Sequence, residues 1–107
     1  MKPRIILADD HVMVADGLGR IIKTVADLVA TVNDGLTLVA AVRTLRPDIV
    51  VSDISMPGLS GLEALQTLRN DLVCPKFIFL TVHDQRALLQ RAMRSGAKGY
   101  ILKHMAG

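Results

Sequence analysis

Cysteine, aromatic residues and long apolar runs are all scarce in this sequence. A single cysteine, Cys74, excludes an intramolecular disulfide framework and fits a reducing cytoplasm. The only aromatic residues are Phe77, Phe79 and Tyr100, too few for a platform on which single-stranded nucleic acid could stack. No apolar run approaches the roughly 18–20 residues that a membrane span needs, and the run at 5–8 ends too soon for a signal peptide. We therefore expect a soluble, cytoplasmic protein.

Charge of either sign is also limited. The chain carries 13 basic and 10 acidic residues, a formal net charge of +3, and the basic residues are scattered along it. A scattered set of this kind is typical of a solvated surface rather than of a nucleic-acid-binding face. Half of the residues are hydrophobic and 21% are charged, so a chain of 107 residues has the composition of one globular domain with one core.

Short apolar runs alternate with longer segments of helical periodicity. The runs at 4–8, 28–32, 49–52, 77–80 and 99–102 predict buried strands, and the intervening segments predict four helices. Such alternation is typical of an α/β fold, in which a parallel sheet is covered by helices on both faces through right-handed crossovers. Ligands of such folds bind beyond the carboxyl ends of the strands.

The helical segments carry recognisable stripes and caps. Apolar residues recur at three- and four-residue steps in the first helix, at Val14, Leu18, Ile21, Ile22 and Val25. Asp34 can cap the second helix, and Ser60 with Glu63 can form a capping box for the third. Gly96 suits a left-handed exit from the fourth helix.

Polar side chains gather at the predicted strand ends. Asp9 and Asp10 follow the first strand, Asp53 follows the third, Thr81 ends the fourth and Lys103 follows the fifth. Because parallel strands all end at the same edge of a sheet, we expect these five residues to converge. Taken singly, Asp10 could be a helix N-cap and Lys103 a solvated surface residue, but their conjunction indicates a site.

The convergent residue types indicate phosphoryl-transfer chemistry. Three neighbouring carboxylates repel one another, and a hard divalent cation such as Mg²⁺, which prefers oxygen ligands, would neutralise them. The ammonium of Lys103 and the hydroxyl of Thr81 can each stabilise an oxygen of a transferring phosphoryl group. A carboxylate can itself be the nucleophile and form an aspartyl-phosphate.

The set formed by Asp9-Asp10, the segment 53–58, Gly61, Thr81 and the segment 99–103 resembles the receiver domain of two-component response regulators. The resemblance covers the whole chain, and segments 9–11, 17–18 and 96–100 look most like the LuxR/NarL-type subgroup. It implies a flavodoxin-like, doubly wound five-stranded sheet of order 2-1-3-4-5. We expect residues 1–107 to be a receiver truncated before its final helix, without an output domain. A homodimer that covers the exposed sheet face, or a rearranged C-terminal end, would be the alternatives.

The resemblance also implies a role for each residue of the metal site. Asp53 would be the phosphoacceptor and would take a phosphoryl group from a phosphohistidine of a sensor histidine kinase. Asp10 and Asp53 would bind Mg²⁺ directly, and Asp9 mainly through water. The backbone carbonyl of Ser55 would complete the protein ligands.

The remaining implied roles concern the phosphoryl group and the response to it. Lys103 would pair with the phosphate, and Thr81 would close toward it. Tyr100 would then change rotamer and alter the partner surface that controls a LuxR-type helix-turn-helix domain, and through it transcription. The protein would assist its own phosphorylation and dephosphorylation but act as a regulatory switch, not as a turnover enzyme.

Two other interpretations remain beside the phosphorylated switch. A receiver-like module could bind partner proteins without being phosphorylated. A flavin or nucleotide domain of the same class is disfavoured because the carboxylates of Asp9 and Asp10 would repel a phosphate. The histidines, His11, His83 and His104, do not have the spacing of a zinc site.

Overall fold

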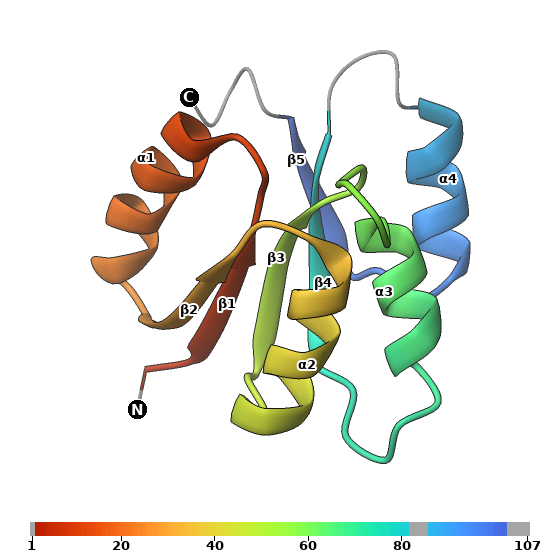
Figure 1. The fold of residues 1–107 in the computed structure, drawn as a ribbon, viewed down its shortest axis with the longest axis horizontal. Helices are drawn as coiled ribbons and strands as arrows, with labels where there is room; N and C mark the ends of the chain where they lie inside the picture. Colours follow the sequence, from red (N-terminus) through yellow and green to blue (C-terminus); the bar gives the residue numbers. More distant parts are fainter. Residues whose placement is uncertain (1, 82–85, 103–107) are drawn as a thin grey trace.

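The computed structural model describes residues 2–81 and 86–102, where five strands alternate with four helices (Figure 1). The strands are β1 (Arg4–Ala8), β2 (Asp27–Val32), β3 (Ile49–Asp53), β4 (Lys76–Thr81) and β5 (Gly99–Leu102). The helices are α1 (Val12–Lys23), α2 (Gly35–Leu45), α3 (Gly61–Leu68) and α4 (Arg86–Arg94). All strand pairs are parallel and the order is β2-β1-β3-β4-β5, which confirms the predicted flavodoxin-like sheet; no helix follows β5 in the described part of the chain.

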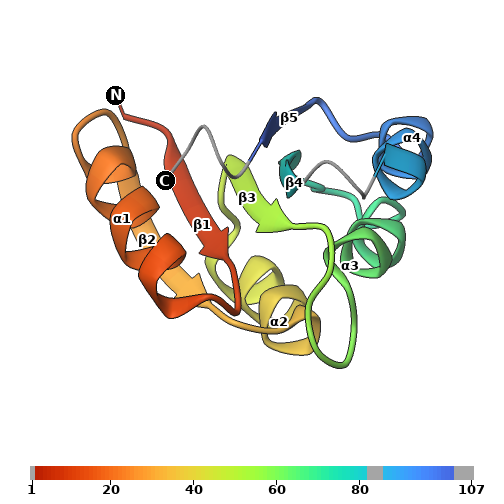
Figure 2. The same ribbon diagram turned by 90° about the horizontal axis from the view of Figure 1, so that it is seen from above.

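Helices cover both faces of the sheet and enclose two hydrophobic cores. The larger core lies beneath α2, α3 and α4, which follow one another along one side of the sheet in Figure 2. The smaller core lies beneath α1 on the opposite face. Because successive side chains of a strand point to opposite faces, Ile6 joins the larger core and its neighbour Leu7 joins the smaller one.

The helix caps and the left-handed helix exit predicted from the sequence are present in the structure. The Asp34 carboxylate accepts a hydrogen bond from the Thr37 backbone N–H at 2.7 Å, and Ser60 and Glu63 form the reciprocal capping box of α3. Gly96, with φ of 114°, provides the left-handed exit after α4. Within residues 2–81 and 86–102, no helix combines the length and apolar character that crossing a membrane demands.

The apolar stripe predicted for α1 is wrong in part. The buried residues of this helix are Ala15, Leu18, Gly19 and Ile22, whereas Ile21 is 58% exposed. Neighbouring positions on a helix differ by about 100° in direction, so Ile21 points away from the face that buries Ile22. Val25 lies beyond the end of α1 at Lys23 and is also exposed.

Strand register brings three chain segments to one edge of the sheet. Ala8 of β1 lies opposite Ser52 of β3, and Asp53 of β3 lies opposite Leu80 of β4. Asp9 follows Ala8 along the chain, and Thr81 follows Leu80. Both residues therefore lie close to the end of β3. This edge is the upper one in Figure 1, where β1 leads into α1.

Candidate functional site

A cluster of three carboxylates and one imidazole lies at this edge, and we call it the strand-end cluster: Asp9, Asp10, His11 and Asp53. One ligand atom from each residue lies within 4.8 Å of every other. Asp9 and Asp53 are each 2% exposed, whereas the side chain of Asp10 is 31% exposed. The cluster thus has a buried floor and an opening to solvent.

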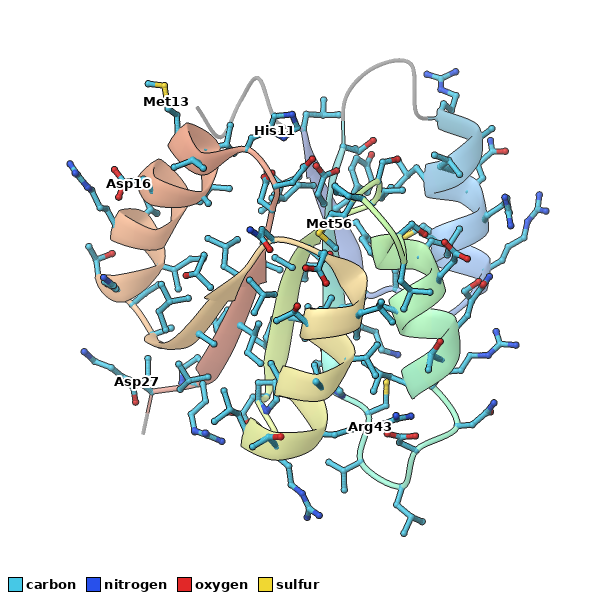
Figure 3. All side chains as sticks on the ribbon, in the orientation of Figure 1. His11, Met13, Asp16, Asp27, Arg43 and Met56 are labelled. Atoms are coloured by element: carbon cyan, nitrogen blue, oxygen red, sulfur yellow. The ribbon has the colours of Figure 1, made fainter. Side chains whose placement is uncertain are left out.

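The imidazole of His11 lies among the carboxylates of the strand-end cluster. Its Nδ1 is 3.0 Å from Asp9 Oδ1, 3.3 Å from Asp10 Oδ1 and 3.7 Å from Asp53 Oδ2. The backbone N–H of His11 also donates a hydrogen bond to Asp9 Oδ1 at 2.8 Å. Figure 3 places His11 above the strand ends, while Met13 on the next turn points outward.

Sequence reasoning missed His11 as a member of this site. The spacing of His11, His83 and His104 does not predict a zinc site, and His83 and His104 lie outside the described residues. Its position in the sequence could have indicated that His11 belongs to the site, because it directly follows the two aspartates at the end of β1.

His11 also occupies the N-cap position of α1, and no side chain caps this helix. The alternative of Asp10 as a helix N-cap is therefore wrong. The chain reaches α1 through an extended residue at position 11, with φ of −93° and ψ of 103°, so Asp10 precedes the cap and its carboxylate belongs to the cluster instead.

The loop after β3 holds the Asp53 side chain and α3 in fixed positions. The Ser55 backbone N–H donates a hydrogen bond to Asp53 Oδ1 at 3.2 Å, and the Gly61 N–H donates to the Ile54 carbonyl at 2.9 Å. A Cβ atom at Gly61 would lie 2.1 Å from the Asp53 carbonyl oxygen and 2.7 Å from Ser52 Oγ. Only glycine allows α3 to begin this close to β3.

The other predicted site residues lie in three different situations. Thr81 is 1% exposed at the carboxyl end of β4, one residue beyond the partner of Asp53. Tyr100 lies in β5 opposite Phe79 and is 52% exposed, outside the strand-end cluster. Lys103 lies outside the described residues, so its predicted place beside Asp53 stays a prediction.

The donor set of the strand-end cluster fits a hard divalent cation. Carboxylate oxygens are the ligands that Mg²⁺ prefers, and its octahedral shell usually keeps several waters. The exposed side of Asp10 leaves room for such waters, while the buried carboxylates of Asp9 and Asp53 bring negative charge that a cation would balance. The cluster could therefore hold a metal ion.

Comparison with known proteins gives one consistent family. Residues 5–107 match the family described as the response regulator receiver domain. The oxygen regulatory protein NreC of Staphylococcus epidermidis is 39% identical over 104 residues, covering 94% of this chain and 48% of that protein. The transcriptional regulatory protein MctR of Rhizobium johnstonii is 36% identical over 107 residues, covering 98% and 50%. The chain thus spans about half the length of these curated relatives.

Solved structures show the same likeness in three dimensions. A DNA-binding response regulator of the LuxR family from Staphylococcus aureus superimposes with a TM-score of 0.89 at 27% identity, covering 95% of this chain and 87% of that one. A two-component response regulator of the LuxR family from Aurantimonas sp. SI85-9A1 gives a TM-score of 0.87 at 33% identity, covering 96% and 75%.

Proposed function

Because the chain belongs to the response regulator receiver family, we propose that residues 1–107 form a phosphoacceptor receiver of a two-component signalling system. The observation that carries this proposal is the buried Asp53 carboxylate inside the strand-end cluster, within 4.8 Å of further carboxylates. The family is regulatory and signalling, so the proposed role is that of a switch rather than of an enzyme that turns over substrate.

In the proposed reaction, Asp53 is the nucleophile. A carboxylate oxygen attacks the phosphorus of a phosphohistidine on a sensor histidine kinase, the P–N bond breaks as the P–O bond forms, and the kinase imidazole leaves. The Ser55 N–H bond to Asp53 Oδ1 at 3.2 Å holds the carboxylate in a defined orientation. Burial of Asp53 to 2% exposure keeps bulk water away from the resulting acyl phosphate.

Mg²⁺ is the cofactor that we propose for this site. Asp10, Asp53 and the Ser55 backbone carbonyl would bind it directly, and Asp9 would bind it through water. When bound, the ion supplies positive charge that balances the developing charge on the phosphoryl oxygens. Thr81, at the end of β4, would donate its hydroxyl hydrogen bond to that group, and Lys103 would pair with it through its ammonium.

The proposed output is a change of the surface formed by α4 and β5. Closure of Thr81 toward the phosphoryl group opens space beside β4, and Tyr100 on the neighbouring strand would change rotamer into it. The altered face, in a monomer or a homodimer, would control a LuxR-type DNA-binding domain and thereby transcription in the cytoplasm. This part of the proposal draws on relatives that are about twice as long and bear regulatory names.

Phosphorylation by a small-molecule donor tests the proposal directly. The purified chain is treated with acetyl phosphate and Mg²⁺, and its intact mass is measured beside the Asp53→Asn variant and the Asp16→Asn control. Asp16 is an exposed carboxylate on α1, paired with Arg20 and outside the strand-end cluster. We expect the mass of one phosphoryl group on the unchanged chain and on Asp16→Asn, and none on Asp53→Asn.

Other outcomes would overturn the proposal. Absence of a mass gain, together with no binding of beryllium fluoride, would favour an interaction module that works without phosphorylation. A mass gain that persists in Asp53→Asn would move the acceptor to another residue. Copurification of a yellow cofactor or of a nucleotide would favour a flavin or nucleotide domain.

A further inference from the structure

The position of His11 carries an inference about the metal that goes one step beyond the proposed function and rests on it. Its Nδ1 lies 3.3 Å from Asp10 Oδ1 and 3.7 Å from Asp53 Oδ2, the two side chains proposed as direct ligands. In an octahedral shell with bonds of about 2.1 Å, adjacent ligand atoms are about 3.0 Å apart and opposite ones about 4.2 Å. Both distances fall between these two values, so the nitrogen lies close enough to these oxygens to share one cation with them.

The backbone holds His11 in this position even though its side chain is 60% exposed. Its N–H donates to Asp9 Oδ1 at 2.8 Å, and its carbonyl accepts the first hydrogen bond of α1, from the Ala15 N–H at 2.9 Å. The residue is thus fixed between the end of β1 and the first turn of α1. A ring that starts here reaches the carboxylates without any rearrangement of the chain.

We infer that His11 is a nitrogen ligand of the cation bound by the strand-end cluster, and that it gives the site a preference for transition cations over Mg²⁺. An imidazole nitrogen binds Co²⁺ and Ni²⁺ more strongly than Mn²⁺, whereas Mg²⁺ favours oxygen and water. A site with carboxylates alone would discriminate less among these ions. His11 would thus determine which divalent ion accompanies phosphorylation of Asp53.

A hydrogen bond from the imidazole to the carboxylates would produce similar distances, so the test must detect the metal–nitrogen bond itself. The chain is loaded with Mn²⁺ alone, and pulsed electron paramagnetic resonance measures the coupling of the ion to a nearby nitrogen nucleus. Labelling histidine with ¹⁵N identifies the source of the coupling. The variant His11→Gln retains a hydrogen-bond donor for the carboxylates but lacks the ring nitrogen, and His83→Gln is the control histidine variant.

We expect a histidine nitrogen coupling in the unchanged chain and in His83→Gln, and its loss in His11→Gln. Calorimetry with Co²⁺ should show at least about a tenfold loss of affinity in His11→Gln, because even outer-shell changes at metal sites cost about 10–100-fold. The affinity for Mg²⁺ should change by less than about twofold, since Mg²⁺ prefers oxygen ligands and water.

Failure of this inference differs from failure of the proposed function. Binding of Mn²⁺ without nitrogen coupling, or with coupling that persists in His11→Gln, overturns the role of His11 and leaves the phosphoacceptor intact. If neither Mn²⁺ nor Mg²⁺ binds, the metal part of the proposed function is overturned together with this inference. Equal losses of Co²⁺ and Mg²⁺ affinity in His11→Gln also overturn it, because a general disturbance of the cluster would then explain both.

Discussion

Gly61 occupies a position where a single methyl group would disturb the end of β3 at Asp53. A Cβ there would meet the Asp53 carbonyl oxygen at 2.1 Å, which is far inside van der Waals contact. We expect Gly61→Ala to lower the free energy of unfolding by about 1–3 kcal/mol, the usual cost of overpacking. Urea unfolding followed by circular dichroism measures this, and the rate of phosphorylation by acetyl phosphate should fall as well.

Gly17 provides the matched control for Gly61. It lies within α1, and a Cβ at this position would have no other atom within 4 Å. Gly17→Ala should therefore stabilise the protein by about 0.5–1 kcal/mol through its higher helix propensity. Equal effects of the two substitutions would contradict the close approach of α3 to β3.

Cys74 is predicted to be a slowly reacting thiol. Its burial raises the pKa of the thiol, the nearby Asp71 carboxylate raises it further, and Sγ donates a hydrogen bond to the Pro75 carbonyl at 3.5 Å. The thiolate is the nucleophile, so alkylation by iodoacetamide at pH 8 should be slower than for a free cysteine peptide. The rate should increase when urea unfolds the chain; equal rates in both states would argue against the raised pKa.

At the residue scale, the sequence predicted which carboxylates meet but not what lies between them. Asp9 and Asp53 follow apolar runs, so strand ends alone place them at one edge of a parallel sheet. The direction of the His11 ring depends on the backbone dihedrals of the turn into α1, and no periodicity reveals those. For the same reason the alternative of Asp10 as an N-cap was wrong by one residue, since His11 holds that position.

At the scale of elements, the Asp34 cap of α2 gives a pH-dependent contribution to stability. Hydrogen bonds from the Thr37 backbone N–H, and then from the Thr37 hydroxyl, lower the pKa of the Asp34 carboxyl in the folded state. A group whose pKa falls on folding stabilises the protein above its unfolded pKa, about 3.9, and this contribution is lost as the pH falls through the folded value.

The variants Asp34→Ala and Asp34→Asn separate capping from titration. Asp34→Ala should be less stable than the unchanged chain at pH 6–7, and the gap should narrow below about pH 4 as the carboxylate protonates. Asp34→Asn keeps a capping oxygen and should remain close to the unchanged chain at neutral pH. The urea concentration at the midpoint of unfolding, measured across this pH range, provides the check. A stability difference between Asp34→Ala and the unchanged chain that widens on acidification would contradict the prediction.

Which segments form helices and which form strands was predictable from the sequence, whereas their first and last residues were less so. Asp53 and Thr81 extend β3 and β4 beyond the apolar runs, because ladder hydrogen bonds continue regardless of side-chain polarity. The sequence pattern did not reveal that Ile21 is exposed, for a related reason. An apolar residue beside a helix stripe looks like part of it until neighbouring elements define which face is covered.

At the scale of the whole molecule, charge repulsion in the strand-end cluster links metal binding to stability. Asp10→Asn should raise the free energy of unfolding in a metal chelator by about 1 kcal/mol, the Coulomb energy of two unit charges 4 Å apart in water. Added Mg²⁺ should stabilise the unchanged chain, by about 2.7 kcal/mol at 100 times its dissociation constant, and stabilise Asp10→Asn much less.

Thermal or urea unfolding with and without Mg²⁺ measures both effects, with Asp16→Asn as the exposed control that should respond to Mg²⁺ like the unchanged chain. A chelated Asp10→Asn variant that is less stable than the unchanged chain would mean that Asp10 makes a stabilising contact instead of a repulsive one.

The strand order was the most predictable property of the whole molecule. Alternating strands and helices with crossovers of one hand leave few ways to arrange five parallel strands, and the motif at Asp9-Asp10 selects among them by resemblance. Which face each helix covers follows from the same topology, with α1 alone on one side of the sheet within the described residues.

The position of the strand-end cluster in the chain has a consequence for biosynthesis. All four of its residues lie between positions 9 and 53, whereas Thr81 and Lys103 are translated later. At elongation rates of 5–20 residues per second, a ribosome takes about 3–10 s to travel from codon 53 to codon 103. A nascent polypeptide would therefore carry the carboxylates of the proposed cation site for several seconds before Lys103, which would pair with a phosphoryl group on Asp53, is synthesised.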